Sequence, residues 1–303
     1  MEFFEDTVAA KSLIEKMIQK YGYAAEHNYY WYQYYQYYYN PPEHNIFAKT
    51  DHGALFTAYD KHKDEYFVVF DPLALPEYRV PLLMEYITWI FSNTTARKIW
   101  FQLDRSARLE FLYTLPRSYR SCRIYYTMVW PVTDLRKFNP ELSGGHYKTL
   151  RKEMHKFYRE HQVSICDAKN YGDRDSLHAV VDNWKKRRGG HDRGMTGVYH
   201  HVIDGGFEGM DEARVFVVDG KEAGFNAGFM IPNSDRFYGA IGIHDYSVDD
   251  LGTMLYLEDL MWLKNHGYHE ADMGGSEKPL LAFKNKFSPD SFYKNDIFSV
   301  VKR

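Results

Sequence analysis

Apolar residues recur along the chain with two different periods, and these predict alternating helices and strands. Tyr147, Leu150, Met154 and Phe157 have the spacing of one helix face. Alternating stretches on both sides of Asp219-Gly220 predict a β-hairpin, because this dipeptide favours the tight turn. The pattern of the second half predicts helix 143–161, strand 163–167, a helix through 177–184, helix 198–203, strands 214–218, 222–231 and 236–243, helix 252–266, strand 268–273, helix 279–287 and strand 292–301.

The first half predicts the same order of elements. Helix 8–21 and strands 45–50, 53–59 and 66–71 precede a helix, a strand, a helix and a strand. Several residue types also repeat at a constant offset of 173 positions, namely Leu82 and Leu255, Glu85 and Glu258, Trp89 and Trp262, and Pro116 and Pro289. We therefore expect an internal duplication, with domains 1–135 and 136–303 and a linker near 132–145. The predicted fold class is α/β, an α+β layered arrangement with mixed sheets flanked by helices.

Length, charge and cysteine count exclude several classes of protein. The 303 residues can bury a sizeable core, and a formal net charge of -3 disfavours a generic binder of polyanions. Two cysteines, Cys122 and Cys166, cannot build a disulfide framework. No apolar run approaches the roughly 20 residues that span a bilayer, and the acidic N-terminus lacks the positive region of a signal peptide. These features predict a cytoplasmic protein.

Aromatic residues are unusually frequent, at 17% of the chain, and many lie in the segment from Tyr21 to Tyr39. A helix whose tyrosine rings are buried while their hydroxyls reach water would explain this segment. The alternative is an interface with a second subunit or a substrate. An oligomer formed through Tyr21 to Tyr39 is therefore one expectation.

Three short motifs and the aromatic segment near Tyr29 to Tyr39 carry a resemblance to a known family. The motifs are GHYKTLRKEMHK (Gly145 to Lys156), DMGGS (Asp272 to Ser276) and LAFKNKFS (Leu281 to Ser288). Together with the order of elements, they resemble the GNAT acyltransferases, and two tandem copies resemble the Fem-type aminoacyl transferases. The chain is most similar to the C-terminal domain of phosphatidylglycerol lysyltransferases. The resemblance implies two GNAT-like domains, a catalytic second copy and a degenerate first one.

The loop from His244 to Thr253 bears on the acyl donor. In GNAT enzymes that use acetyl-CoA, the equivalent loop is rich in glycine and basic residues, and its amides hold the pyrophosphate. Here it contains one glycine and three aspartates, Asp245, Asp249 and Asp250. Carboxylates at this place repel a pyrophosphate, so the sequence favours aminoacyl-tRNA over acyl-CoA as donor.

Two basic segments are candidate donor-binding surfaces. The stretch from Lys185 to Gly194 includes Arg187, Arg188 and Arg193, and a helix carries Arg151 and Lys152. Arginine binds phosphate through two parallel hydrogen bonds, and neighbouring glycines allow close approach. A solvated helix end or helix face explains the same residues without any ligand.

The DMGGS motif and the following helix supply candidate catalytic residues. Transfer to an amine requires a base and stabilisation of an oxyanion. Asp272 or Glu277 is expected to accept the proton, and Lys284 to stabilise the oxyanion or a phosphate. Lys284 and Lys286 diverge on a helix, so one of them is expected to face the cleft and the other the solvent. Other expected substrate-binding residues are Asn226, Tyr238, His244, Gly274, Gly275, Ser276 and Lys286.

Three functions follow. The favoured one is transfer of an aminoacyl or acyl group from an activated donor, preferably aminoacyl-tRNA, to an amine or hydroxyl of a small molecule, peptide or lipid headgroup. The alternatives are an acyl-CoA-dependent N-acetyltransferase and a non-catalytic protein that binds a ligand or partner. No metal and no tightly bound cofactor are expected, since neither His200-His201 nor His266 and His269 resembles a zinc pattern.

Overall fold

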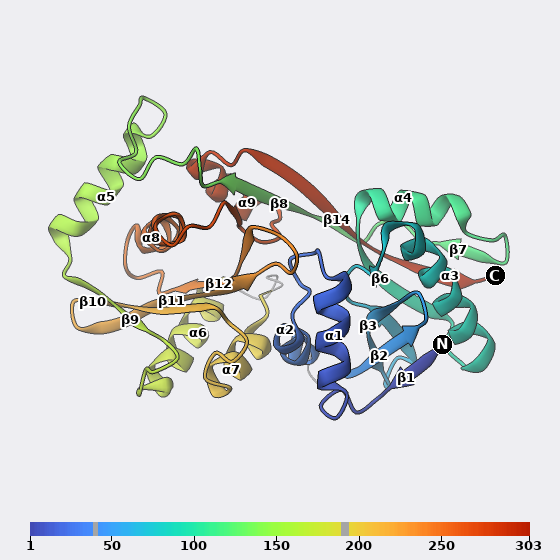
Figure 1. Ribbon diagram of the computed structural model, residues 1–303. Helices are drawn as coiled ribbons and strands as arrows, with labels where there is room; N and C mark the ends of the chain where they lie inside the picture. The colour runs from blue at the N-terminus through green and yellow to red at the C-terminus, as the bar shows by residue number, and fades with distance from the viewer. Residues whose placement is uncertain (39–41, 189–193) are drawn as a thin grey trace.

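The computed structural model describes residues 1–38, 42–188 and 194–303. The first half contains β1 (Glu2–Phe4), α1 (Lys11–Tyr21), α2 (Tyr29–Tyr35), η1 (Gln36–Tyr38), β2 (His44–Thr50), β3 (Gly53–Asp60), β4 (Glu65–Val68), β5 (Leu73–Ala74), α3 (Pro76–Asn93), β6 (Lys98–Asp104), α4 (Arg105–Thr114), β7 (Tyr119–Ser121) and β8 (Tyr126–Asp134). The predicted α/β fold with a mixed sheet is confirmed (Figure 1).

The second half repeats this order. It contains α5 (Lys148–Glu160), β9 (Val163–Asp167), α6 (Arg174–Arg188), α7 (Thr196–Asp204), β10 (Glu212–Val218), β11 (Lys221–Met230), β12 (Arg236–His244), α8 (Leu251–Asn265), β13 (Glu270–Asp272), α9 (Lys278–Lys284), η2 (Asn285–Phe287) and β14 (Ser291–Lys302). The expected helix 143–161 begins only at Lys148, because Leu142 and Gly144 have positive φ and the chain turns there. The expected strand 66–71 ends at Val68.

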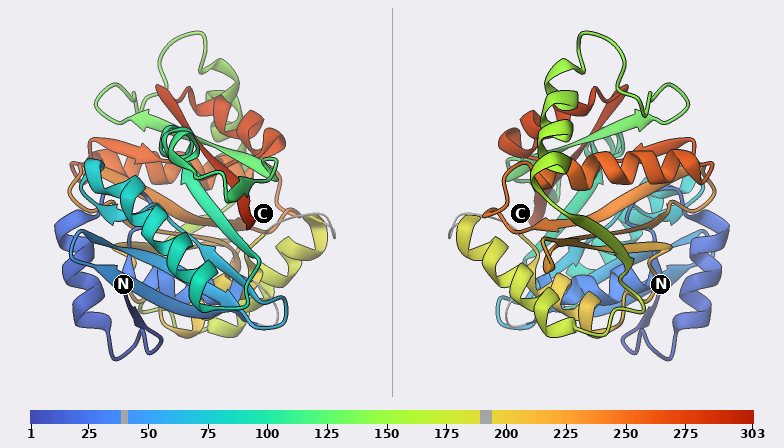
Figure 2. Two further views of the ribbon diagram at one scale, coloured as in Figure 1. Left: turned by 90° about the vertical axis from the view of Figure 1, so that its right-hand side faces the viewer. Right: turned by 90° about the vertical axis from the view of Figure 1, so that its left-hand side faces the viewer.

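Helices cover both faces of the sheet. In the second half, α6 and α7 lie on one side of β9 to β12, and α5 and α8 lie on the other (Figure 1). In the left view of Figure 2 the first half faces the viewer, and α3 crosses in front of its strands. In the right view the second half faces the viewer, and α5 and α8 cross in front of its strands. The register of the duplication holds, since Glu85 and Trp89 lie on α3 while Glu258 and Trp262 lie on α8.

The final strands of the two halves are exchanged. The sheet order is β1-β2-β3-β4-β6-β14-β8-β13-β12-β11-β10-β9. The last strand of the chain, β14, pairs with β6 of the first half, and β8 of the first half pairs with β13 of the second. Each half therefore completes the sheet of the other. The division after residue 135 stays a prediction, and β14 lies between β6 and β8, both of the first half.

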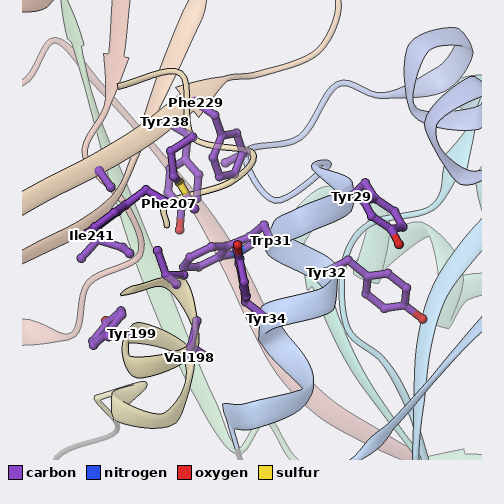
Figure 3. Packing of buried hydrophobic residues seen from close by; sticks show 14 of the residues in the cluster. Tyr29, Trp31, Tyr32, Tyr34, Val198, Tyr199, Phe207, Phe229, Tyr238 and Ile241 are labelled. Carbon is purple, nitrogen blue, oxygen red and sulfur yellow. The ribbon is translucent and has the colours of Figure 1, made fainter. Parts of the chain in front are cut away.

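The aromatic segment forms the short helix α2 between the two halves. Trp31 and Tyr32 are completely buried, and Tyr29 and Tyr34 are nearly so. Trp31 points toward Tyr238 and Phe229 of the second half, whereas Tyr32 points the other way and donates to the Thr57 carbonyl in β3 (Figure 3). These four rings pack inside the chain, so they are not available to a second subunit. Tyr39 lies outside the described residues.

Candidate active site at the seam of the two halves

Asp272 ends β13 at the point where the strands of the two halves meet. Its side chain is buried, and its two carboxylate oxygens have different partners. Oδ1 accepts the Gly274 amide at 3.0 Å, and Oδ2 accepts the Tyr293 hydroxyl at 2.6 Å. Tyr293 belongs to β14, so the exchanged strand holds this carboxylate in place.

Lys284 approaches the same turn from the last residue of α9. Its ammonium group is buried and donates to the carbonyl oxygens of Met273 and Gly274, the latter at 3.0 Å. Lys286, two residues further on, is partly exposed and pairs with Glu153 of α5 at 3.5 Å. The expected divergence of the two lysines is therefore confirmed, and Lys284 faces the seam.

Burial brings the pKa values of these two groups close together. Desolvation raises the pKa of Asp272 to about 6, although the hydrogen bond from Tyr293 opposes this. Desolvation lowers the pKa of Lys284 to about 7, although the charge of Asp272 opposes it. Groups with pKa values near neutrality can give and take protons at the pH of a cell. A buried acid and a buried base with adjacent pKa values are typical of a catalytic site.

The backbone of the DMGGS motif forms a tight turn between Asp272 and α9. Gly274 has φ +80°, a conformation that L side chains rarely adopt. Ser276 is buried, and its hydroxyl donates to the Gly274 carbonyl at 3.1 Å. Gly275 is the partly exposed residue in this otherwise buried stretch. The turn is therefore held from inside and opens to solvent at Gly275.

Aromatic rings from both halves enclose the turn. Tyr238 of β12 lies opposite Asp272 in the parallel pairing of β12 and β13. The Trp130 ring of β8 stacks on Tyr293 with 5.5 Å between ring centroids, and its centroid is 5.6 Å from that of Tyr238. Burial raises the pKa of both tyrosines, so they remain protonated donors. Sequence reasoning singled out Tyr238 but missed Trp130 and Tyr293.

The first half also contributes a buried carboxyl group. Glu26, in the loop before α2, accepts a hydrogen bond from Gln102 of β6 at 2.6 Å. Desolvation raises its pKa, and the negative charges of Asp71 and Asp272 add to this effect. Its charge also acts on Tyr238 and Tyr293. No local motif marks Glu26 in the sequence, because its neighbours at the seam come from distant strands.

A second candidate surface lies at the far end of β12. The C-terminal end of α6 and the turn between β12 and α8 form a groove of about 460 Å³, lined by Asn183, Lys186, Arg187, Asp245 and Ser247. Arg188 donates to the Tyr246 hydroxyl at 3.3 Å across this groove. The structure thus brings the predicted basic segment against the predicted acidic loop. Residues 189–193, including Arg193, lie outside the described residues.

The turn beside this groove satisfies its own amides. The Asp245 carboxylate accepts the Ser247 amide at 2.8 Å, and the Asp245 carbonyl accepts the Val248 amide at 3.3 Å. The ring of His244 occupies the space next to Gly252, where a Cβ atom would approach it to 2.6 Å. Burial, with the charge of Arg188, lowers the pKa of His244 to about 4, so its ring is neutral at pH 7. This turn does not have the form of an open pyrophosphate cradle.

β12 and β13 pair over only a short stretch. Their pairing covers Arg236 to Tyr238 and Glu270 to Asp272, and beyond it a cavity of about 40 Å³ borders Gly239, Gly242 and Tyr256.

The remaining predicted residues lie elsewhere. Arg151 donates to the carbonyls of Leu142 and Gly144, so it fixes the entry to α5. Lys152 is exposed on α5, and Glu277 is exposed at the start of α9. Asn226 is buried and donates to the Leu255 carbonyl at 3.0 Å, while its side chain also binds Asp259. Its amide thus joins β11 to α8, which accounts for its burial without a substrate.

Two features are absent from the described residues, a metal-binding cluster and a membrane-spanning helix. Over residues 1–38, 42–188 and 194–303, no group of three or more His, Cys, Asp or Glu side chains is placed to hold a metal ion. In the same part of the chain, no helix has both the length and the apolar character needed to cross a bilayer.

Solved structures with the same architecture define the class of fold. Across 96% of this chain and 91% of the other, the structure of L-PGS from Bacillus licheniformis is similar, with a TM-score of 0.67 and 14% identity. FemX is similar with a TM-score of 0.63 and 11% identity, over 99% of this chain and 97% of FemX. A tandem GNAT protein from the clavulanic acid biosynthesis pathway is similar with a TM-score of 0.58 and 12% identity, over 99% of this chain and 98% of the other. The fold is therefore that of the tandem GNAT and Fem-like proteins.

The sequence itself identifies the family. Residues 17–225, more than half of the chain, match the model of the phosphatidylglycerol lysyltransferase C-terminal domain. The chain belongs to this family. No curated protein is similar enough in sequence to count as a relative.

Proposed function

We propose that this protein transfers an aminoacyl group from aminoacyl-tRNA to a hydroxyl or amine acceptor. The relatives named as phosphatidylglycerol lysyltransferases make the glycerol hydroxyl of a phospholipid the first acceptor to test. Small amines and peptide amines are the alternatives.

The turn between β12 and α8 is the observation that carries the choice of donor. Two of its amides, those of Ser247 and Val248, are bound by Asp245, and its carboxylates oppose a pyrophosphate. An ester-linked donor needs no pyrophosphate cradle, because its activated carbonyl is delivered at the end of a nucleic acid.

The seam residues fit the chemistry of this transfer. The acceptor oxygen or nitrogen attacks the ester carbonyl carbon, and a new C–O or C–N bond forms. The bond between that carbon and the ribose oxygen of the tRNA then breaks. Asp272 takes the proton of the acceptor, and the ribose oxygen receives a proton as it leaves, by way of Lys284. Both roles need pKa values near 7, which burial produces here.

One side of α5 fits the nucleic-acid part of the donor. Lys148, Lys152, His155 and Arg159 are exposed and recur at helical spacing. Basic side chains in a row neutralise successive phosphates, and such binding weakens as salt rises. Within the described residues, no acidic side chain is paired with Lys152.

A labelled-donor assay tests the proposal. Transfer RNA charged with a mixture of labelled amino acids is incubated with the protein and with phosphatidylglycerol vesicles, with amines, or with neither. We expect label to move into one acceptor and acetyl-CoA to support no transfer. Transfer from acetyl-CoA alone would favour the N-acetyltransferase alternative, and no transfer from either donor would favour a binding protein.

Two adjacent residues of α5 supply matched variants for the donor. Lys152→Ala is expected to weaken charged-tRNA binding severalfold at low salt and leave stability unchanged. Arg151→Ala is expected to lower the free energy of unfolding by about 1 kcal/mol, because two loop carbonyls lose their donor. Equal effects of both variants on gel retardation would contradict a role for the exposed side of α5.

A further inference from the structure

Trp130 has a buried hydrogen-bond donor without a partner. The side chain is 2% exposed, and no group in the described part of the chain accepts a hydrogen bond from its Nε1. A buried indole N–H normally has a partner, because leaving it unpaired costs free energy. An orphan donor at a candidate active site indicates that a ligand supplies the acceptor.

The indole lies directly over the open point of the DMGGS turn. A Cβ atom placed on Gly275 would lie 3.0 Å from Cε2 of Trp130, the ring carbon bonded to Nε1. Gly275 is also the partly exposed residue of the stretch from Ala271 to Ser276. Glycine at this position therefore lets the turn lie directly against the edge of the indole that carries Nε1, at the partly exposed residue of this stretch.

The other groups around the turn leave this donor a defined role. Asp272 is held by Tyr293 and by the Gly274 amide, and Lys284 is held by two carbonyls. These groups are already paired, whereas Trp130 is not. An indole N–H is a neutral donor that cannot accept, so it binds a carbonyl oxygen or an oxyanion and does not bind an ammonium group.

We propose that Trp130 binds the carbonyl oxygen of the acyl group through its indole N–H and stabilises the oxyanion that forms during transfer. This inference rests on the proposed function. When the acceptor attacks the carbonyl carbon, the π electron pair moves to that oxygen, and the hydrogen bond from Nε1 strengthens. When the bond to the ribose oxygen breaks, the pair returns and the carbonyl reforms. The first half of the chain thus supplies a catalytic residue to the second.

Trp31 provides a matched control. Its Nε1 also lacks a partner within the described residues, and the side chain is completely buried. Its ring is surrounded by core side chains, among them Phe229 and Tyr238 (Figure 3). Trp31→Phe and Trp130→Phe therefore remove the same chemical group from two different surroundings.

The test uses protein labelled with ¹⁵N at the indoles of its six tryptophans. The probes are 3′-aminoacylamino-3′-deoxyadenosines, stable amide analogues of the charged end of tRNA, one for each amino acid. The probe that raises the Tm is expected to move the Trp130 indole resonance downfield and leave that of Trp31 in place. In the transfer assay, Trp130→Phe is expected to lower kcat about 100-fold with little change in KM. Trp31→Phe is expected to keep kcat.

Each failure has a separate meaning. A probe that raises the Tm without moving the Trp130 resonance overturns this inference and leaves the proposed function standing. A panel in which no probe binds overturns both. Since the spectra are recorded on the unchanged chain, the inference remains falsifiable even where Trp130→Phe fails to fold.

Discussion

The two halves place different residues at equivalent positions of one strand–helix unit. In both halves an acidic residue precedes the helix, Asp104 before α4 and Glu277 before α9. The seventh residue after it is Phe111 in the first half and Lys284 in the second. Both side chains are buried, but Phe111 packs on Phe101 and Phe298, whereas Lys284 binds backbone carbonyls.

The strand before the helix shows the same contrast. Five positions before Asp104 and Glu277, the first half has Ile99 and the second half has Asp272. Two positions before them, the first half has Gln102 and the second half has Gly275. Burying a charge costs stability that an apolar side chain in the same position would supply. The second half has the charged residues and the open glycine, and the first half has the packed ones.

Transplanting the lysine into the first half gives the largest expected effect. Phe111→Lys places an amine in a cluster of Ile, Leu and Phe side chains. We expect the free energy of unfolding to fall by about 4 kcal/mol or more, measured by urea denaturation. Phe111→Leu is the control, with a loss of about 1 kcal/mol. A stable Phe111→Lys variant would show that the first half tolerates the charge as well.

Removing the lysine from the second half has a smaller effect that depends on pH. Lys284→Met keeps the volume but removes the ammonium donor from the Met273 and Gly274 carbonyls, which keep only the hydroxyls of Tyr256 and Ser276 as donors, so we expect a loss of about 1–3 kcal/mol. In the folded chain the pKa of Lys284 is about 7, below its ordinary value of 10.5. Between these two pH values the unfolded chain binds the extra proton, so the stability of the unchanged protein rises with pH.

The variant lacks this rise. From pH 7 to 9.5, the advantage of the unchanged protein over Lys284→Met is therefore expected to grow by up to about 1 kcal/mol per pH unit. Asp272 acts in the opposite sense, because its raised pKa makes stability fall between pH 4 and 6. Urea denaturation across this pH series measures both slopes. A difference that stays constant above pH 7 would mean that Lys284 keeps an ordinary pKa.

Adding a methyl group at Gly275 is expected to have the smallest effect on stability of the three changes. The methyl group of Gly275→Ala would approach the Met128 sulfur to 2.9 Å and the Trp130 ring to 3.0 Å. These groups must move slightly, and we expect a loss of about 1 kcal/mol. Gly172→Ala is the matched control, since a Cβ there meets nothing within 4 Å. Thermal unfolding of both variants decides the point, and identical Tm values would show that the turn has spare room.

Local patterns predicted the elements but not all of their partners. The ranges of β9, α7 and β12 follow from alternation and helical spacing, and the divergence of Lys284 and Lys286 follows from helix geometry. Strand exchange could not be predicted, because apolar alternation identifies a buried strand without saying which edge it joins. For this reason Trp130 and Tyr293 went unnoticed. The expectation that Asn226 binds substrate stays a prediction, and its observed partners, Leu255 and Asp259 on α8, lie about 30 residues further along the chain.

The position of β14 determines how long the sheet stays incomplete while the chain is being synthesised. It is made after the other strands described above, yet it lies in the middle of the sheet, between β6 and β8. At about 5–20 residues per second, a ribosome needs roughly 10–40 s to proceed from Asp104 to Ser291. During that interval the edge of β6 has no neighbour on one side. A nascent chain with an open edge is prone to wrong pairing, so chaperone binding during synthesis is expected to be stronger than for a protein built from two separate halves.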